Sequence, residues 1–150
     1  MQATYKEIIT GRAKNIFTAN TRTGYCRRLR ANYRFISPAG KEYVYQWLWD
    51  TAFHAIVLAN FDTEWAKNEI NNFLAAQFPD GFLPHVIFWD DDLLAMPHWA
   101  YIESRPGVFP KTSAITQPPA LALAAEVIYN RDGDREFLRN VLPKLAAFHH

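Results

Sequence analysis

The sequence has little cysteine, no block of like charges and no long apolar run, and each of these shortages excludes a class of protein. A single cysteine, Cys26, excludes an internal disulfide framework and fits a reducing compartment. The net charge is +1, so no long-range field favours nucleic acid or an anionic membrane surface. No apolar stretch approaches the roughly 18 residues of a membrane helix, and the polar N-terminus does not resemble a signal peptide. We therefore expect a cytoplasmic protein that binds neither nucleic acid nor membranes.

Three short polar motifs imitate binding sites but lack essential parts. The basic run "CRRLR", Cys26–Arg30, is interpreted as a solvated loop in preference to a nucleic-acid patch. The three aspartates at 90–92 have no histidines at metal-binding spacing, so a solvated loop is favoured there too. The run Asn130–Asp134 imitates the start of a calcium loop, but Arg135 stands where glycine is needed and Val141 where the bidentate glutamate belongs. The sequence therefore predicts no metal and no cofactor.

The pattern of apolar and polar residues predicts helices along most of the chain. At 150 residues, 49% hydrophobic, the chain is long enough for one folded core. Apolar residues recur at helical spacing from Thr4 to Ala19, which is typical of an amphipathic surface helix. From Gln46 to Phe61 the chain is apolar nearly all round, which indicates a buried helix. Asp62 can cap a third helix with Lys67 on its polar face. The apolar stripe of that third helix is Ala66, Ile70, Phe73 and Leu74.

The second half of the chain continues this alternation. A long loop from Pro79 to about Ser113 includes "PHVIFW", which could form a local hairpin. Pro118 and Pro119 occupy the first positions of a nearly all-apolar helix, "PPALALAAEVIY". Arg135–His150 is amphipathic again, and Pro143 is expected to interrupt or kink it. Surface and buried helices thus alternate, as in a double ring whose inner helices line an axis, whereas a plain bundle makes its helices similarly amphipathic. The predicted fold class is all-α.

Three motifs together resemble the glycoside hydrolases with an (α/α)6 barrel. They are "WLWD" (Trp47–Asp50), "PDGFLPH" (Pro79–His85) and "ITQPP" (Ile115–Pro119), in the order and spacing of that family. The sequence is most similar to family 63 and its bacterial mannosylglycerate and glucosylglycerate hydrolase branch. The resemblance implies that residues 1–150 are the N-terminal portion of a single (α/α)6 catalytic domain. A complete ring of twelve helices needs at least roughly 200 residues. We therefore expect an incomplete barrel, either a fragment or a chain that completes itself with another chain.

The aromatic stretch "YVYQWLWDTAFHAI" carries most of the predicted sugar-binding residues. Asp50 lies among apolar residues and needs a partner, which a sugar hydroxyl or His54 one turn further on could supply. Trp47 and Trp49 either offer flat faces to a pyranose or fill the core. Because residues two apart on a helix diverge by about 200°, both can face one pocket only at the helix start. The resemblance implies that Asp50 holds the sugar where the bond breaks and that Tyr43 lines the same pocket.

Two further residues complete the predicted site. The Gln117 amide can donate to and accept from a sugar hydroxyl, or Gln117 or Thr116 caps the helix that follows. His85 either faces the cavity or has a structural role. The loop that carries Phe88, Trp89, Trp99 and Tyr101 is expected at the pocket mouth. The predicted substrate-binding residues are Tyr43, Trp47, Trp49, Asp50, His85 and Gln117.

No catalytic pair is predicted within the chain. Glycoside hydrolysis requires two carboxylates on opposite sides of the bond. The resemblance implies an aspartate acid in a Glu-Ser-Gly-x-Asp motif and a glutamate base, and we expect both beyond His150. The acidic residues Glu103, Glu126 and Asp90 lie in the wrong motif context.

The predicted function is that of an inverting glycoside hydrolase acting on small α-glycosides such as glucosylglycerate or mannosylglycerate. This chain would supply the sugar-binding half. The alternatives are a non-catalytic helical carbohydrate-binding or scaffold protein, and another α/α-toroid sugar enzyme such as a trehalase-like one. Because two nearly all-apolar helices would be left uncovered, we also expect self-association of the isolated chain.

Overall fold

The computed structural model describes residues 3–27, 29–89 and 111–149, and helices dominate this part of the chain. The helices are α1 (Tyr5–Asn20), α2 (Leu48–Leu58), α3 (Thr63–Leu74), α4 (Leu121–Asp132) and α5 (Arg135–Phe148). The strands are β1 (Thr21–Cys26), β2 (Ala31–Ile36), β3 (Gln46–Trp47), β4 (Val86–Phe88) and β5 (Lys111–Thr112). None of these five helices has the length and hydropathy that crossing a membrane requires. The all-α prediction is therefore right for the helical body and wrong for the two small sheets.

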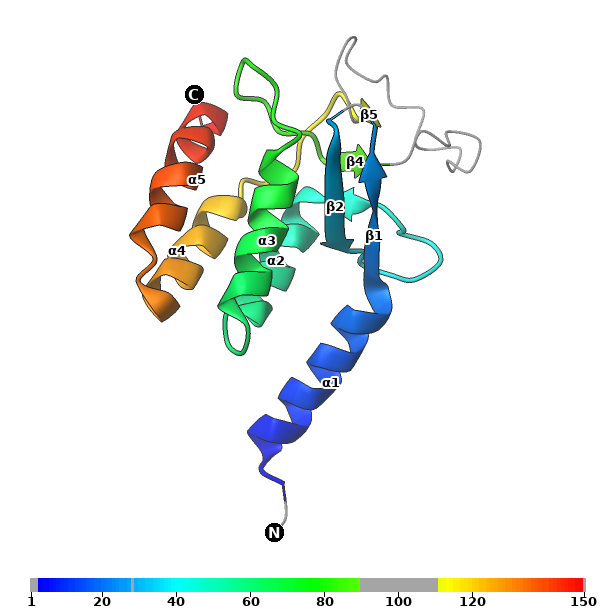
Figure 1. Cartoon of the computed structure of the whole chain (residues 1–150), viewed down its shortest axis with the longest axis vertical. Coiled ribbons are helices and arrows are strands. Elements are labelled where there is room, and N and C mark those ends of the chain that lie inside the picture. The colour runs from blue at the N-terminus through cyan, green and yellow to red at the C-terminus, as the bar shows by residue number, and fades with distance from the viewer. Residues whose placement is uncertain (1–2, 28, 90–110, 150) are drawn as a thin grey trace.

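Helices α2 to α5 pack together as two consecutive pairs, and α1 extends away from them (Figure 1). Helix α2 contacts both α3 and α4, while α5 contacts α3 and α4. The shared core contains large, fully buried side chains from each of α2, α3 and α4, namely Leu48, Leu58, Ile70, Phe73, Leu74, Leu121 and Ile128. The apolar stripe predicted for α3 is thus confirmed, because all four of its members are buried.

Helix α2 is buried on one side only, which corrects the prediction of burial all round. Leu48, Ala52 and Ala55 are fully buried, whereas Phe53 is 52% exposed and Val57 40% exposed. Leu123 of α4 is exposed in the same way. The two helices predicted to be internal therefore present apolar side chains that no described part of the chain covers.

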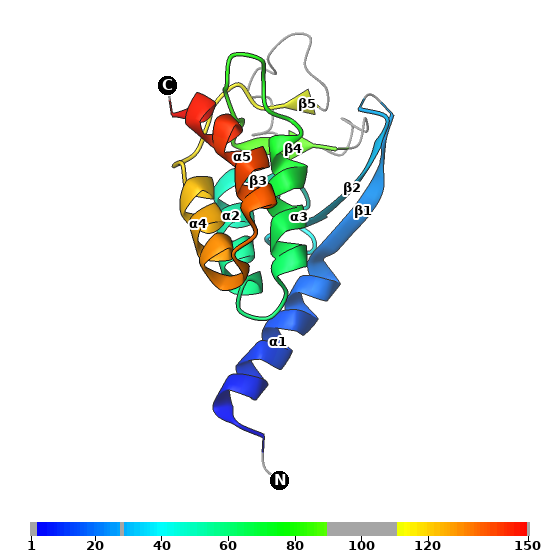
Figure 2. The same cartoon turned by 60° about the vertical axis from the view of Figure 1, so that its left-hand side comes forward.

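A two-stranded hairpin follows α1 directly, and the sequence analysis missed it. Strands β1 and β2 pair antiparallel from Thr21 opposite Ile36 to Cys26 opposite Ala31. Strand β2 lies beside α3 in both views (Figure 2). Cys26 of the run "CRRLR" is the buried last residue of β1, whereas Arg27 and Arg30 are exposed in the turn, as the loop interpretation expects. Gly24 of β1 lies opposite Tyr33 of β2, and the Tyr33 ring occupies the space that a side chain at position 24 would need. This close contact packs the two strands together.

The other sheet joins three segments that are far apart in the sequence. Strand β4 pairs antiparallel with β3 and with β5. The apolar segment "PHVIFW" is therefore not a local hairpin but the centre of a three-stranded sheet. All three residues of β4 are buried. This sheet fixes the chain immediately before α2, where Gln46 and Trp47 form a strand and not the predicted first turn of the helix.

One helix start agrees with the sequence prediction, another differs, and the interruption expected at Pro143 is absent. Asp62 caps α3 as predicted, since its carboxylate accepts from the Trp65 amide at 2.9 Å. Pro118 and Pro119 precede α4, whose N-cap is Ala120, so they lie before the first helical position. Helix α5 continues through Pro143 to Phe148 without interruption.

Lys67, predicted on the polar face of α3, is buried and joins that helix to the turn between α4 and α5. Its ammonium lies 2.9 Å from a carboxylate oxygen of Asp132 and 2.8 Å from one of Asp134, and also pairs with Glu64. Burial alone would lower the pKa of Lys67, but hydrogen bonds to the three carboxylates outweigh it and raise that pKa. These carboxylates are close enough together to suit a metal ion, yet the Lys67 ammonium already pairs with all three.

Candidate functional site

The predicted site residues meet where β3 ends and α2 begins. Trp47 is the N-cap of α2, with an extended backbone of φ −111° and ψ 144°, and its side chain makes no capping hydrogen bond. The first amides of a helix have no acceptor within the helix and need one from elsewhere. At α2, those acceptors come from residues that the sequence analysis assigned to the site.

Two segments outside α2, together with the side chain of Asp50 itself, supply the acceptors. The Leu48 amide donates to the backbone carbonyl of His85 at 3.0 Å. The Trp49 amide donates to Oε1 of Gln117 at 3.2 Å. The carboxylate of Asp50 accepts from its own amide. The start of α2 is therefore built from residues 47–50, 85 and 117 together.

Gln117 caps α2 and not the helix that follows it in the sequence. Helix α4 begins with Ala120 as its N-cap and has no side-chain capping bond. Because Oε1 of Gln117 is used by the Trp49 amide, the orientation of the side chain is fixed. Within the described ranges, its Nε2 group donates to no other residue, which leaves an N–H donor beside the start of α2.

Trp47 is the buried centre of an aromatic group at this junction. Its ring meets the ring of Tyr43 edge-on, with centroids 5.7 Å apart, and the ring of His85 at 4.9 Å. Trp47 is 7% exposed, whereas Tyr43 is 47% and Trp49 43% exposed. Trp47 and Trp49 both lie at the start of α2, which is the position they would need in order to face one pocket. Trp47 forms part of a packed wall, and Trp49 presents its ring to the outside.

Asp50 is half-buried, and burial raises the pKa of its carboxyl group above the ordinary value. Hydrogen bonds from its own amide and from the Trp49 side chain oppose that rise, because they stabilise the charged form. The positive end of the α2 dipole adds to their effect. An ionised Asp50 at this position is an acceptor for hydroxyl groups of a ligand.

His54 does not serve as the partner of Asp50 that the sequence analysis considered. Its ring packs against Phe17 of α1, with centroids 5.2 Å apart, and it hydrogen-bonds the backbone carbonyl of Ile36. Burial lowers the pKa of His54 to about 4, so the ring is neutral at pH 7. His54 thus belongs to the packing beneath α1 and β2.

His85 is buried and helps to fix Trp47 and the start of α2 in position. Its Nδ1 lies 2.6 Å from Oγ of Ser113, and that hydroxyl donates to the carbonyl of Ile115. Burial lowers the pKa of His85, which keeps the ring neutral. His85 therefore holds Trp47 through its ring and α2 through its carbonyl.

Gln46 is a site-supporting residue that the sequence analysis missed. Its side chain is fully buried, and its Oε1 accepts from Asn72 Nδ2 at 2.7 Å and from Trp89 Nε1 at 2.8 Å. These bonds hold β3 against α3 and fix the residue before Trp47. A lone amide inside an otherwise apolar run was the signal that could have identified it.

The aromatic loop was expected at the pocket mouth, and that expectation is wrong for its first two members. Phe88 and Trp89 are buried, at 2% and 6% exposure, and Trp89 stacks on Tyr33 with centroids 5.3 Å apart. Trp99 and Tyr101 lie outside the described residues, as do Asp90 and Glu103. Glu126, the remaining acidic residue set aside above, is exposed on α4.

Comparison with known proteins gives concordant matches. The family model described as "Mannosylglycerate hydrolase MGH1-like glycoside hydrolase domain" matches residues 43–150. The chain is 40% identical over 122 residues to the mannosylglycerate hydrolase of Thermus thermophilus, an alignment that covers 77% of this chain and 29% of that protein. It is 38% identical over 92 residues to the glucosylglycerate hydrolase of Mycolicibacterium hassiacum, covering 57% of this chain and 20% of that protein.

A solved structure agrees at the level of the fold. The crystal structure of a GH63 mannosylglycerate hydrolase from Thermus thermophilus, in complex with Tris and D-glycerate, matches with a TM-score of 0.75 and 36% sequence identity. The match covers 94% of this chain and 32% of that one. The chain therefore spans about a third or less of the length of these relatives.

Proposed function

Since the chain belongs to the mannosylglycerate hydrolase MGH1-like glycoside hydrolases, we propose that its biological activity is the inverting hydrolysis of small α-glycosides such as mannosylglycerate or glucosylglycerate. Residues 1–150 would form the N-terminal portion of a single (α/α)6 catalytic domain. The named activities of the relatives support this substrate class. The chain's own contribution is the sugar contact at the start of α2.

The observation that carries the proposal is the hydrogen bond from the Trp49 amide to Gln117 Oε1. It joins residues 68 positions apart and brings the Gln117 side chain to the start of α2, where Asp50 lies in the first turn. A sugar hydroxyl both donates and accepts, so neighbouring carboxylate and amide groups suit a pair of adjacent hydroxyls. The exposed rings of Tyr43 and Trp49 offer faces for the C–H surface of a pyranose.

The remaining site residues act by holding these groups in place. Trp47 is packed between Tyr43 and His85, and the His85 carbonyl binds the first amide of α2. A rigid arrangement of this kind lowers the entropy that a ligand must lose on binding. We therefore assign sugar contact to Tyr43, Trp49, Asp50 and Gln117, and support of these residues to Trp47 and His85.

The catalytic step is assigned to groups beyond His150. The six-residue cluster contains one carboxylate, Asp50, whereas hydrolysis of a glycosidic bond requires an acid and a base. This single carboxylate also favours the second candidate function, a carbohydrate-binding protein without catalysis. The two candidates differ in whether a longer protein that contains these residues releases sugar.

The test is hydrolysis of mannosylglycerate, glucosylglycerate and trehalose by the 150-residue chain and by the longest reading frame that encodes it. We expect release of sugar by the longer protein only, and proton NMR during the reaction to show the inverted anomer. Turnover by the 150-residue chain would mean that its own carboxylates include a catalytic pair. Binding without release by either protein would support the non-catalytic function, and preferential cleavage of trehalose a trehalase-like one.

A further inference from the structure

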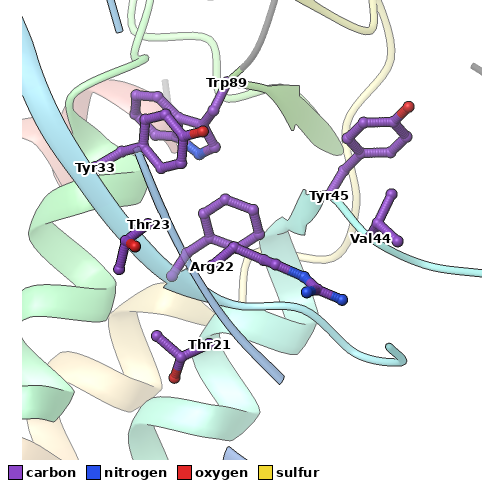
Figure 3. A pocket seen from close by; sticks show the side chains of 8 residues that line it. Thr21, Arg22, Thr23, Tyr33, Val44, Tyr45 and Trp89 are labelled. Carbon is purple, nitrogen blue, oxygen red and sulfur yellow. The ribbon is translucent and has the colours of Figure 1, made fainter. Parts of the chain in front are cut away.

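A separate cavity lies between the β1–β2 hairpin and the segment that leads into β3. Its volume is about 400 Å³, within the range of small-molecule pockets. Its lining includes Arg22, Thr23, Tyr33, Phe35, Tyr45 and Trp89. Figure 3 shows the rings of Tyr33 and Trp89 on one side, Tyr45 on the other, and the Arg22 side chain running between them. None of the six residues assigned to the sugar contact or its support lines this cavity.

Its aromatic walls are held in place from behind. Tyr33 and Trp89 stack with centroids 5.3 Å apart and an interplanar angle of 23°. Trp89 is fixed by its indole N–H, which donates to Gln46 Oε1 at 2.8 Å. Across the cavity, the ring of Tyr45 meets Phe88 edge-on at 4.8 Å. Two facing walls of fixed rings suit a flat ligand with apolar C–H faces, such as a pyranose.

Arg22 places a positive charge in this aromatic setting without an acidic partner in the described part of the chain. One guanidinium nitrogen, Nη2, donates to the carbonyl of Gly40 at 2.6 Å and so holds the group in position. The Nε–H is buried and finds no acceptor among the described residues. The ion pairs recorded for those residues all involve Lys67. A guanidinium fixed in this way is suited to bind a carboxylate through two N–H groups.

We propose that this cavity, the Arg22 pocket, binds a sugar acid, that is, a pyranose that carries a carboxylate. The ring lies between the Tyr33–Trp89 pair and Tyr45, and the carboxylate pairs with Arg22. A neutral sugar would leave the guanidinium unpaired, and a small anion would leave the aromatic walls without contact. The pocket is thus a second ligand site, additional to the sugar contact at α2.

The experiment is calorimetric titration of the 150-residue chain with three probes: glucuronate, glucose and acetate. We expect glucuronate to bind saturably, and glucose and acetate to bind at least tenfold more weakly. Equal binding of glucose and glucuronate, or no saturable binding of glucuronate, would overturn the proposal.

Variants separate this pocket from the α2 site. Arg22→Gln should weaken glucuronate binding at least tenfold, whereas the matched change Arg12→Gln, on the exposed surface of α1, should not. Tyr45→Ala removes one wall and leaves Arg22 in place, so it should cause a similar loss, and circular dichroism checks the fold of each variant. The loss caused by Arg22→Gln should persist in an Asp50→Asn background, so the proposed function can fail without this inference failing. Binding that survives both Arg22→Gln and Tyr45→Ala contradicts the proposal.

Discussion

Among single residues, Asp50 has the most direct chemical consequence for the proposed sugar contact. It accepts from its own amide and from the Trp49 side chain, so a ligand hydroxyl would add a charge-assisted bond. Replacing Asp50 by Asn removes the charge and should weaken glycoside binding about 10- to 100-fold, since a hydrogen bond to a charged group contributes about 1.5–3 kcal/mol. Titration of mannosylglycerate into both proteins measures the effect.

The pH dependence of that binding follows from the raised pKa of Asp50. Only the ionised carboxylate accepts hydroxyl bonds with full charge assistance, so affinity should fall as the pH falls through this pKa. The loss should begin at a higher pH than it would for an exposed aspartate. Affinity for mannosylglycerate that stays constant across this range in the native chain would contradict the assignment of Asp50.

A second pH prediction concerns Glu69 and the free energy of unfolding. Its side chain is fully buried, Oε1 accepts from the Ile36 amide at 2.7 Å, and Oε2 has no partner among the described residues. Burial raises the pKa of Glu69 well above its ordinary value, despite opposing contributions from the Ile36 amide and Arg34. The folded protein therefore keeps a proton that the unfolded chain releases.

Stability from Glu69 is present below the ordinary glutamate pKa and is lost as the pH rises toward the folded-state pKa. Between these values its contribution falls by about 1.4 kcal/mol per pH unit. Glu69→Gln, which cannot ionise, should flatten the pH dependence of the unfolding free energy in urea titrations above pH 5. The same change at exposed Glu126 should leave the slope as it is. Identical slopes for Glu69→Gln and the native chain would contradict a protonated Glu69.

Residue by residue, the sequence indicates which chemical groups are present more readily than what they contact. The six residues assigned to the sugar site do assemble around one helix start, and their role in binding stays a prediction. The acceptor role of Gln117 toward Trp49 was not predictable, because no local pattern links residues so far apart. His54 was considered as a partner for Asp50 on helical spacing alone, and its contacts with Phe17 and Ile36 come from other elements.

At the scale of elements, Gly133 and Gly81 both have positive φ, but only Gly133 has space for a side chain. Gly133 is the left-handed C-cap of α4, at φ 70°, and no atom stands near the position of an added Cβ. Gly81 has φ 88°, and an added Cβ would overlap the backbone carbonyl of Ala147 in α5. Gly133→Ala should cost about 1 kcal/mol, the usual penalty for a left-handed non-glycine residue.

Gly81→Ala carries the same penalty and must also displace a helix backbone. We expect it to cost roughly 3 kcal/mol or more, in the range of overpacking and backbone-strain effects. Urea denaturation of both variants measures the difference, with Gly133→Ala as the matched control. Equal losses would show that the segment around Gly81 does not pack closely on α5.

The helices were predictable because their apolar spacing is a local property, and the strands were not. The turn between β1 and β2 lacks the Asn-Gly or Asp-Gly pair that marks a tight hairpin, and Arg30 adopts its φ of 51° instead. Strand β4 pairs with β3 some 40 positions earlier, opposing Ile87 to Gln46, and with β5 some 25 positions later, opposing Ile87 to Thr112. Such pairings depend on tertiary contacts, which a single sequence does not display.

At the scale of the molecule, the helices show which surfaces the described chain covers and which it does not. Helices α2 and α4 bury one face each in the common core, yet α2 exposes Trp49, Phe53 and Val57, and α4 exposes Leu123. Helix α1 adds exposed Tyr5, Ile8, Ile9 and Ile16. In a double ring, the inner helices would be covered by further helices. Because the chain spans about a third or less of its relatives, the proposed barrel accounts for these apolar side chains.

This arrangement predicts self-association of the 150-residue chain in isolation, since exposed apolar surface gains free energy when it is removed from water. Sedimentation velocity over a concentration series should show a weight-average mass that rises with concentration. Phe53→Gln combined with Val57→Gln should shift that rise to higher concentration, because both substitutions make the exposed face of α2 polar and keep good helix formers. Tyr25→Gln, a similar change on the hairpin and away from that face, should have little effect. A monodisperse monomer that melts cooperatively would instead show that α2 and α4 tolerate exposure, and the apolar face would then lose its value as support for a larger ring.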